Sequence, residues 1–399
     1  MQLLDTLKDK KILTAIGMMS GTSMDGIDIA LLKSDGESFV ERGPSLEIPY
    51  SDHTKANIEQ ALIDAKEITY REQRIGIMEV LEKELTDLHA NAIEQFLTKF
   101  NLNRADVDLI GFHGQTVLHR PNGKRPDDAL TVQLGNGETL AKQTGINVVY
   151  DMRANDMKHG GQGAPLVPIY HKALVRSLPD ELKAKAPIAF VNIGGISNIT
   201  FIGRASDNEE GELVAFDTGP GNALIDQWVQ ANSNQLIDKD GELAGKGRVI
   251  TMITKQYLAE SYFQQTLPKS LDRLDFQPLQ DKVEKDFISL EDGARTLCYV
   301  TAAAIVKSVD LLPEPPKLWI ICGGGRKHPS IMEDLKTLTS YQRGEVISAE
   351  QAVLDGDSME AEAWAYLAIR SAKNLPLTFP MTTGCEKAVS GGVMVGPKL

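Results

Sequence analysis

The sequence predicts an α/β protein built from two related domains with a cleft between them. Its 399 residues exceed what one typical hydrophobic core can organise. Strand-like apolar runs alternate with helical patterns along the chain, which is typical of α/β architecture. Residues 16–32 and 188–202 resemble each other, because both are two strand-like runs joined by a turn of small polar residues. Each half of the chain therefore opens with a predicted hairpin.

The first half continues from its hairpin into a helix and further strands. Leucine and isoleucine at three- and four-residue steps predict a long helical stretch from about residue 54 to residue 100. Residues 107–116 (VDLIGFHGQT) predict a buried strand that ends in a polar turn. Residues 131–145 predict a strand, a glycine-rich turn and a helix, and residues 146–151 predict a short apolar strand.

The second half repeats this alternation. Residues 188–203 predict two strands joined by a Gly-Gly turn, and residues 213–229 predict a strand, a loop and a helix. A long helix is predicted over residues 290–312. After a proline-rich break, residues 318–335 predict a strand, a glycine-rich loop and a helix, and residues 357–374 predict another helix.

Charge and composition limit the partners. The net charge of −13 argues against nucleic acid or an anionic membrane, because both require a basic surface. It does not exclude an anionic small molecule, since backbone amides can bind anions locally. The three cysteines form no CxxC pair, which disfavours a zinc site or a disulfide framework and favours a reducing compartment. No run approaches the roughly 20 apolar residues of a membrane span, so we expect a cytoplasmic protein.

Four glycine-rich loops follow strand-like runs, at residues 21–28, 160–165, 217–222 and 323–325. Glycine lets backbone N–H groups approach phosphate oxygens, and a following helix N-terminus favours negative charge. Any one of these loops could be an ordinary structural turn. Neither the GxxxxGK[ST] loop nor the GxGxxG pattern is present. Four such loops in a two-domain chain together favour a nucleotide-binding cleft of another kind.

The first of these loops has more polar groups than a hairpin turn requires. Its backbone amides and the hydroxyls of Thr22 and Ser23 could hold the β- and γ-phosphates of a nucleotide. Asp25 or Asp28 could approach Mg²⁺, directly or through water. This loop is therefore a candidate phosphate and metal site.

Asp217 is the strongest candidate for acid–base chemistry. It ends the strand-like run LVAFD and opens the loop TGPGN, so its carboxylate is expected at a strand tip beside a phosphate-sized gap. A kinase needs a carboxylate near the γ-phosphate that can take a proton from the attacking group. The alternative is that Asp217 caps the helix that begins near Asn222.

Three further residues are candidates for substrate contact, each with a structural alternative. His113 begins a loop, where it could contact a ligand or be a buried structural histidine. Arg153 could pair with a substrate carboxylate bidentately, or with Asp151 or Asp156 nearby in the sequence. Glu360 lies on a predicted helix whose small residues would allow close approach of a ligand, although a solvated helix face is the default.

The ordered motifs GMMSGTSMDGID, GFHGQT, GGQGAPLVP, NIGGISNIT, FDTGPGN and CGGG together closely resemble the anhydro-N-acetylmuramic acid kinases of bacterial cell-wall recycling. The resemblance implies a sugar-kinase/actin/Hsp70-type fold, with two ribonuclease-H-like domains around an ATP cleft. We expect the first domain to comprise residues 1–155, completed by residues 378–399. The second is expected to comprise residues 156–377. A homodimer is common in the family.

The resemblance also implies a reaction and a set of site residues. Water opens the 1,6-anhydro bridge while O6 receives a phosphoryl group from ATP with Mg²⁺, and Asp217 is the matching catalytic base. Glu360 matches a family sugar contact, and we assign Arg153 and the GGQG turn to the lactyl carboxylate and acetamido side as a hypothesis. The expected nucleotide contacts are Gly21, Thr22, Ser23, Met24, Asp25, Gly26, Ile27, Asp28, Gly219, Gly221, Asn222, Gly323, Gly324 and Gly325. The expected substrate contacts are His113, Arg153, Gly161, Gln162 and Glu360.

Two alternatives stay open. Another kinase of the same fold would phosphorylate a free hydroxyl of a hexose or small acid; it would keep the base and the ATP loops but lack the GGQGAP and FDTGPGN pair. An actin- or Hsp70-like nucleotide switch would use ATP to drive partner binding, although no peptide-binding or polymer-contact segment is visible in the sequence.

Overall fold

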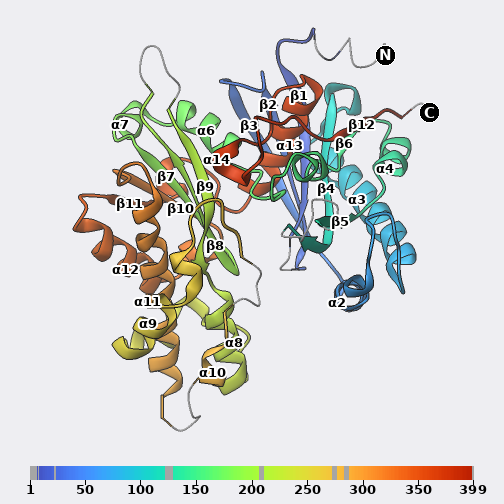
Figure 1. Cartoon of the computed structure of the whole chain (residues 1–399). Helices are drawn as coiled ribbons and strands as arrows, with labels where there is room; N and C mark the ends of the chain where they lie inside the picture. Colours follow the sequence, from blue (N-terminus) through green and yellow to red (C-terminus); the bar gives the residue numbers. More distant parts are fainter. Residues whose placement is uncertain are drawn as a thin grey trace. The chain divides into compact units, whose positions relative to one another are not determined.

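The computed structural model describes Leu7 and residues 9–21, 24–121, 129–205, 211–271, 276–282 and 287–397. The chain forms two compact units, shown in Figure 1: Met1–Ser177 with Ser358–Leu399, and Leu178–Asp357. These units differ from the expected division after residue 155 and before residue 378. The second of these differences arises because helix α13 (Met359–Ala372) packs against the sheet of the first unit.

The described part of the first unit contains one seven-stranded sheet. Its strands are β1 (Leu13–Ser20), β2 (Gly26–Ser34), β3 (Val40–Pro49), β4 (Leu109–Arg120), β5 (Leu130–Leu134), β6 (Asn147–Tyr150) and β12 (Val393–Val395). The order is β12-β6-β4-β1-β2-β3, and β5 pairs with β4. The first three strands are antiparallel, whereas β4 runs parallel to β1 and β6 parallel to β4. This is the strand order of a ribonuclease-H-like domain, as expected.

Helices cover the sheet of the first unit. They are α2 (Asp52–Asp64), α3 (Met78–Lys99), α4 (Gly137–Thr144), α5 (Ala154–Lys158), α6 (Pro168–Ser177), α13 and α14 (Pro380–Thr383), with short 3-10 turns η1 (Ala65–Glu67) and η2 (Arg104–Asp106). Apolar side chains of α2, α3 and α4 form one core with strand residues such as Ile16, Met18 and Ile110. Since side chains alternate along a strand, the residues between these point to the other face.

That other face of the sheet is packed closely against α13. A Cβ at Gly17 would lie 1.8 Å from the Ala361 carbonyl oxygen, and one at Gly111 would lie 2.1 Å from the Trp364 carbonyl oxygen. Both strand positions therefore require glycine, because a helix backbone lies directly above them. The small residues of α13 allow this close packing of the helix on the sheet. The sequence predicts instead that they make room for a ligand.

The helical stretch expected from about residue 54 to residue 100 is interrupted in the structure. The structure has two helices, α2 and α3, separated by ten non-helical residues after η1, 68–77. Gly76 in this connection has a φ of 57°, which a helix cannot accommodate. A Cβ there would also lie 2.0 Å from the Asp64 Oδ2 atom, which accepts the Ile77 N–H. The leucine and isoleucine spacing is that of two amphipathic helices, and the break is a local glycine effect.

The second unit is built on a five-stranded sheet in its described part. The strands are β7 (Ile188–Ile193), β8 (Ile196–Ile202), β9 (Leu213–Pro220), β10 (Leu318–Cys322) and β11 (Glu345–Ser348). Their order is β11-β10-β7-β8-β9. Strands β7, β8 and β9 are antiparallel, and β10 and β11 continue parallel to β7. The second unit therefore repeats the order of the first, which confirms the two predicted opening hairpins and two ribonuclease-H-like domains.

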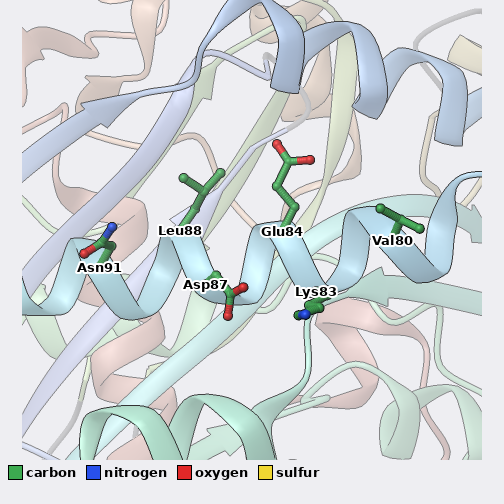
Figure 2. Close-up of a pocket in the computed structure, with 6 residues that line it drawn as sticks. All are labelled: Val80, Lys83, Glu84, Asp87, Leu88 and Asn91. Atoms are coloured by element: carbon green, nitrogen blue, oxygen red, sulfur yellow. The ribbon is translucent and has the colours of Figure 1, made fainter.

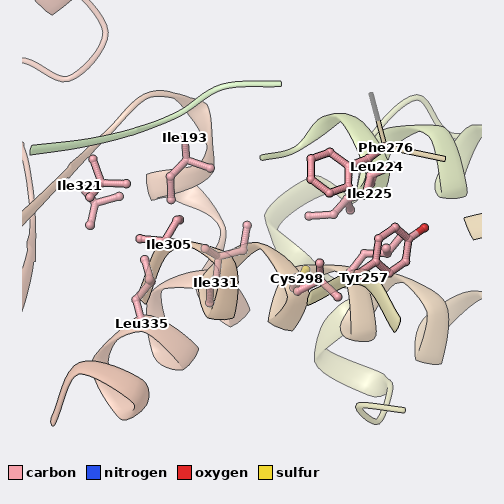
Figure 3. Close-up of a cluster of buried hydrophobic side chains, with 14 of the residues drawn as sticks. Ile193, Leu224, Ile225, Tyr257, Phe276, Cys298, Ile305, Ile321, Ile331 and Leu335 are labelled. Atoms are coloured by element: carbon pink, nitrogen blue, oxygen red, sulfur yellow. The ribbon is translucent and has the colours of Figure 1, made fainter. Parts of the chain in front are cut away.

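Helices of the second unit enclose a large apolar core with the sheet. The helices are α7 (Asp180–Lys183), α8 (Ala223–Asn232), α9 (Thr251–Leu258), α10 (Leu279–Lys282), α11 (Leu290–Lys307) and α12 (Pro329–Ser340). The 3-10 turns are η4 (Lys239–Gly241), η5 (Ala244–Lys246), η6 (Ser261–Gln264), η7 (Ser308–Leu311), η8 (Gly324–Lys327) and η9 (Glu350–Ala352). Figure 3 shows part of this core, where Ile305 of α11 and Ile331 of α12 lie near Ile321 of β10. Across the described chain, no helix combines the length and apolar character needed to cross a bilayer.

Candidate active site

The turn between β1 and β2 is fastened by backbone hydrogen bonds. The Met24 N–H donates to the Gly21 carbonyl over 3.2 Å, and the Tyr50 N–H donates to the Asp25 carbonyl over 2.9 Å. Strand β2 then begins with three further predicted nucleotide contacts, Gly26, Ile27 and Asp28. The predicted phosphate loop is therefore closed by a hydrogen bond within it and tied to Tyr50, the residue after β3.

Two carboxylates of this loop lie near a single hydroxyl group. Burial raises the pKa of Tyr50, and the negative charges of Asp25 and Asp28 raise it further. The charges of both carboxylates, and that of Glu84, therefore act on the Tyr50 hydroxyl, and carboxylate oxygens suit Mg²⁺. In the part of the chain that the structure describes, no three His, Cys, Asp or Glu side chains group closely enough to hold a metal ion. The predicted phosphate contacts Thr22 and Ser23 lie outside the described residues.

Two other predicted glycine loops meet at one edge of the second sheet. Since β9 and β10 both run parallel to β7, the carboxyl ends of all three strands lie at that edge. The N–H groups of Gly221 and Asn222 donate to the carbonyls of residues 195 and 194, over 2.9 and 2.7 Å. Gly325 packs against the end of β7, because a Cβ at Gly325 would lie 2.3 Å from the Ile193 Cγ2 atom. Strand-end loops gathered in this way are the usual ligand site of α/β proteins.

The loop after β10 is rigidly held in a shape that only glycine allows. Gly323 has a φ of 72°, and a Cβ there would lie 2.2 Å from the Asn192 Oδ1 atom. The buried Arg326 donates from Nη1 to the Gly323 carbonyl over 3.0 Å. The same guanidinium forms ion pairs with Glu350 and Asp357 at 2.8 and 2.9 Å. The loop backbone is therefore positioned before any ligand binds.

Asp217 lies within β9, and the expectation that it ends the strand is wrong. The strand continues to Pro220, and Asp217 pairs with Asn198 across the ladder. The Leu271 N–H donates to the Asp217 Oδ2 atom over 2.8 Å, and the Tyr262 hydroxyl donates to the Asp217 main-chain carbonyl. Among the described residues, no side chain caps the N-terminus of α8, so the helix-capping alternative finds no support. The carboxylate is half-buried and oriented by a backbone amide.

In the first unit, His113 and Arg153 form a hydrogen-bonded pair. The His113 Nδ1 atom lies 3.2 Å from the Ser20 carbonyl oxygen, and Nε2 lies 3.2 Å from the Arg153 Nη2 atom. Burial lowers the pKa of His113 well below its ordinary value, and the charge of Arg153 lowers it further. The ring is therefore neutral, donates from Nδ1 to the carbonyl and accepts at Nε2 from the guanidinium. It also packs against Trp364, with 4.6 Å between ring centroids.

The Arg153 guanidinium has a hydrogen-bond donor that no described residue accepts. Its Nη1 atom donates to the Gly163 carbonyl over 2.8 Å, and the guanidinium carbon lies 5.4 Å from the Trp364 ring centroid. Burial lowers the pKa of Arg153 to about 10, and the negative charges of Glu360 and Asp156 oppose that shift. Its Nε atom is buried and has no hydrogen-bond partner among the described residues. A buried arginine with an unused donor is suited to an anionic ligand.

The alternative ion pair proposed for Arg153 with Asp151 is not formed. Asp151 instead accepts from Arg71, whose Nη1 atom lies 3.0 Å from the Asp151 Oδ2 atom. Asp156 lies near Arg153 but serves the neighbouring turn. Asp151 therefore does not occupy the Arg153 guanidinium in an ion pair.

The GGQG turn is held by Asp156 and by the C-terminal segment. The Asp156 carboxylate accepts from the Gly163 N–H and from the Thr383 hydroxyl, both over 2.7 Å. The Gln162 N–H donates to the Thr383 carbonyl over 2.8 Å. Gly161 is required because a Cβ there would lie 2.2 Å from the Asp156 Oδ2 atom. The Gly163 carbonyl then reaches Arg153, which links the turn to the histidine–arginine pair.

The structure thus brings three of the predicted substrate residues, His113, Arg153 and Glu360, to one place in the first unit. It adds Trp364, which the sequence reasoning missed. Trp364 lies four residues after Glu360 on α13, and this helical spacing could have identified it as sharing that face. In the second unit, Tyr262 and the Leu271 segment around Asp217 are not predicted from the sequence, because no glycine or strand pattern marks them.

The pocket drawn in Figure 2 lies elsewhere. Its lining belongs to a single helix, α3, and comprises Val80, Lys83, Glu84, Asp87, Leu88 and Asn91. None of the predicted site residues lines it, so it plays no part in the candidate site.

Each unit therefore has a ribonuclease-H-like sheet with loops suited to a ligand at its strand ends, and the second has an oriented carboxylate. Such a fold and site define a phosphotransferase of the sugar-kinase and actin-like class. Residues 13–397 match the family described as anhydro-N-acetylmuramic acid kinase. The chain belongs to this family, and it is a kinase.

Relatives carrying the same name are similar over nearly their whole length. The protein named anhydro-N-acetylmuramic acid kinase in Agrobacterium fabrum is 53% identical, over 96% of this chain and 99% of its own. The one in Brucella canis is 52% identical, over 96% of this chain and 98% of its own. Among solved structures, hexokinase from Schistosoma mansoni in complex with glucose is 10% identical, with a TM-score of 0.41, over 88% of this chain and 85% of its own.

Proposed function

We propose that this protein uses ATP to convert 1,6-anhydro-N-acetylmuramic acid into N-acetylmuramic acid 6-phosphate, in the recycling of cell-wall peptidoglycan. The observation that carries the proposal is family membership across residues 13–397 together with an oriented carboxylate at the matching position, Asp217. The named relatives at 50–53% identity support the same substrate.

The chemistry assigns Asp217 a specific task. The anhydro sugar has no free 6-hydroxyl, because O6 is bonded to the anomeric carbon C1. The base therefore takes a proton from water, and the water oxygen forms a bond to C1 as the C1–O6 bond breaks. The released O6 attacks the γ-phosphorus of ATP, and ADP departs with the electron pair of the broken P–O bond. Asp217 fits this role because the Leu271 N–H engages Oδ2 and fixes the orientation of the carboxylate.

Each unit has glycine loops that we assign to nucleotide binding. In the second unit we assign the nucleotide to the loops that contain Gly219, Gly221, Asn222 and residues 323–325, where the Gly221 and Asn222 N–H groups hold the shape of the loop itself. In the first unit the hairpin at 21–28 offers its own N–H groups to phosphate oxygens. Asp25 and Asp28 would hold Mg²⁺, which when bound offsets the charge of the phosphates.

We assign the sugar to the cluster in the first unit. Arg153 has an unused buried donor and would bind the lactyl carboxylate, while Glu360 would accept hydrogen bonds from sugar hydroxyls. The turn with Gly161 and Gln162 would contact the acetamido side, and His113 would hold Arg153 in place. A location in the cytoplasm is part of the proposal, supported by three cysteines that are all buried. So is a homodimer.

A coupled assay tests the proposal against both rivals. Purified protein with ATP, Mg²⁺ and the anhydro sugar should release ADP and N-acetylmuramic acid 6-phosphate in equal amounts. Without the sugar, ADP release should be negligible. Phosphorylation of glucose or acetate with none of the anhydro sugar would favour the rival sugar or acid kinase. ATP turnover that ignores the sugar and responds to a protein partner would favour a nucleotide switch.

A further inference from the structure

A segment of irregular chain surrounds Asp217 in the second unit. Tyr262, in η6, donates from its hydroxyl to the Asp217 carbonyl, and Leu271 donates from its N–H to the Asp217 carboxylate. Between them, Lys269 is 6% exposed. The segment thus contacts Asp217 through its main chain and its side chain, and it carries a buried cation.

The Lys269 ammonium rests on the rings that flank Asp217. Its Nζ atom lies 4.3 Å from the centroid of the Tyr262 ring and 5.5 Å from that of Phe216, the residue just before Asp217. Aromatic faces stabilise a cation in this position. Burying a lysine nevertheless opposes its charge, so lysines are almost never fully buried unless paired. Among the described residues, the negative group that acts on Lys269 is Asp217.

Given the base role proposed above, on which this inference rests, we propose that Lys269 is a positioning residue for Asp217. Its ammonium, held against Tyr262 and Phe216, keeps the neighbouring carboxylate ionised and therefore able to accept a proton from water.

The electrostatics of the site support this role. A half-buried carboxylate loses hydration, which favours its protonated and inactive form. A fixed positive charge nearby reverses that preference, and its effect is larger in a protein than in water. Within the described part of the chain, the titratable groups that act on Lys269 are Asp217 on β9, Lys307 on α11 and the phenol of Tyr262. Burial and then Lys307 lower the pKa of Lys269 to about 8, while Asp217 opposes the shift.

Three variants test the proposal. Lys269→Met should lower kcat about 30-fold at pH 7 while KM for ATP and for the sugar stays within about twofold, since the base alone is affected. Lys269→Arg should restore most of the kcat, because the guanidinium keeps the charge. Lys282→Met is the matched control: this lysine also lies on a ring, 4.4 Å from the Tyr257 centroid, but pairs with Glu260. It should leave kcat unchanged.

The pH profile separates this role from a structural one. As the pH rises through about 8, Lys269 loses its proton, so kcat of the native protein should fall toward that of Lys269→Met. In Lys269→Arg this alkaline limb should move to higher pH, because the guanidinium remains charged. The proposal is overturned if Lys269→Met keeps near-normal kcat, or if Lys269→Arg leaves the alkaline limb in place.

The base role and this inference fail in different ways. Normal turnover in Asp217→Asn would contradict the base role itself. Loss of turnover in Asp217→Asn together with native kcat in Lys269→Met would overturn only the role of Lys269.

Discussion

Asp217→Asn should lower kcat by about 10³-fold or more while ATP and sugar still bind. The asparagine side chain has the same shape, and its carbonyl oxygen can still accept the Leu271 N–H that now meets the carboxylate. What it cannot do is take a proton from water at neutral pH. The measurement is kcat from the coupled assay, with ligand affinity from titration calorimetry.

The control for this variant is Asp240→Asn in the same unit. Asp240 is exposed and has a φ of 55°, a conformation that asparagine tolerates well, so the change should alter neither kcat nor Tm. Near-normal turnover of Asp217→Asn, with an unchanged Tm, would refute the base role. Loss of ATP binding in that variant would also contradict it, since the role concerns water and not the nucleotide.

Arg153→Met should raise KM for 1,6-anhydro-N-acetylmuramic acid about 100-fold and leave KM for ATP unchanged. Removing the partner of a carboxylate in a buried site costs on the order of 3 kcal/mol, which is about two factors of ten. The guanidinium is suited to this pairing because Nε has no partner among the described residues, whereas the alternative acid Asp151 is held by Arg71.

A substrate without the lactyl group isolates the contact. 1,6-Anhydro-N-acetylglucosamine lacks the carboxylate, so the native protein and Arg153→Met should have similar KM values for it. Arg71→Met, which loses only the partly exposed pair with Asp151, should behave as the native protein with both sugars. Equal losses of Arg153→Met on both sugars would show that Arg153 does not bind the carboxylate and acts on the shape of the site.

Much of the fold could be predicted because the hairpins and helices have clear local patterns. The missed elements lack them. Strand β3 contains Gly43 and Pro44 and has an exposed face, so its apolar alternation is weak. Strands β11 and β12 have only four and three residues. The C-terminal domain boundary was missed because α13 packs on Gly17 and Gly111 of the first sheet, which lie far from it in the sequence. No local sequence pattern predicts such a contact.

The candidate site divides in the same way. Glycine loops and the acid of β9 carry signals in the sequence itself, since each follows a strand-like run. The segment with Tyr262 and Lys269 carries no such signal, because Tyr262 and Leu271 contact Asp217 from 45 and 54 residues further along the sequence. The role of Lys269 depends on the burial of its side chain, and the burial of a lysine cannot be predicted from the sequence alone. The strand ending expected at Asp217 failed because β8 continues to pair with β9 as far as Pro220.

The path of oxygen tests the central claim most directly. The reaction of the anhydro sugar and ATP should be run for one turnover in water enriched in ¹⁸O, and the sugar phosphate reduced at once to fix its C1 oxygen. Mass spectrometry should find one ¹⁸O atom at C1 and none in the phosphoryl group, because activated water attacks C1 and O6 attacks phosphorus. An unlabelled C1, or label in the phosphoryl group, would contradict the mechanism.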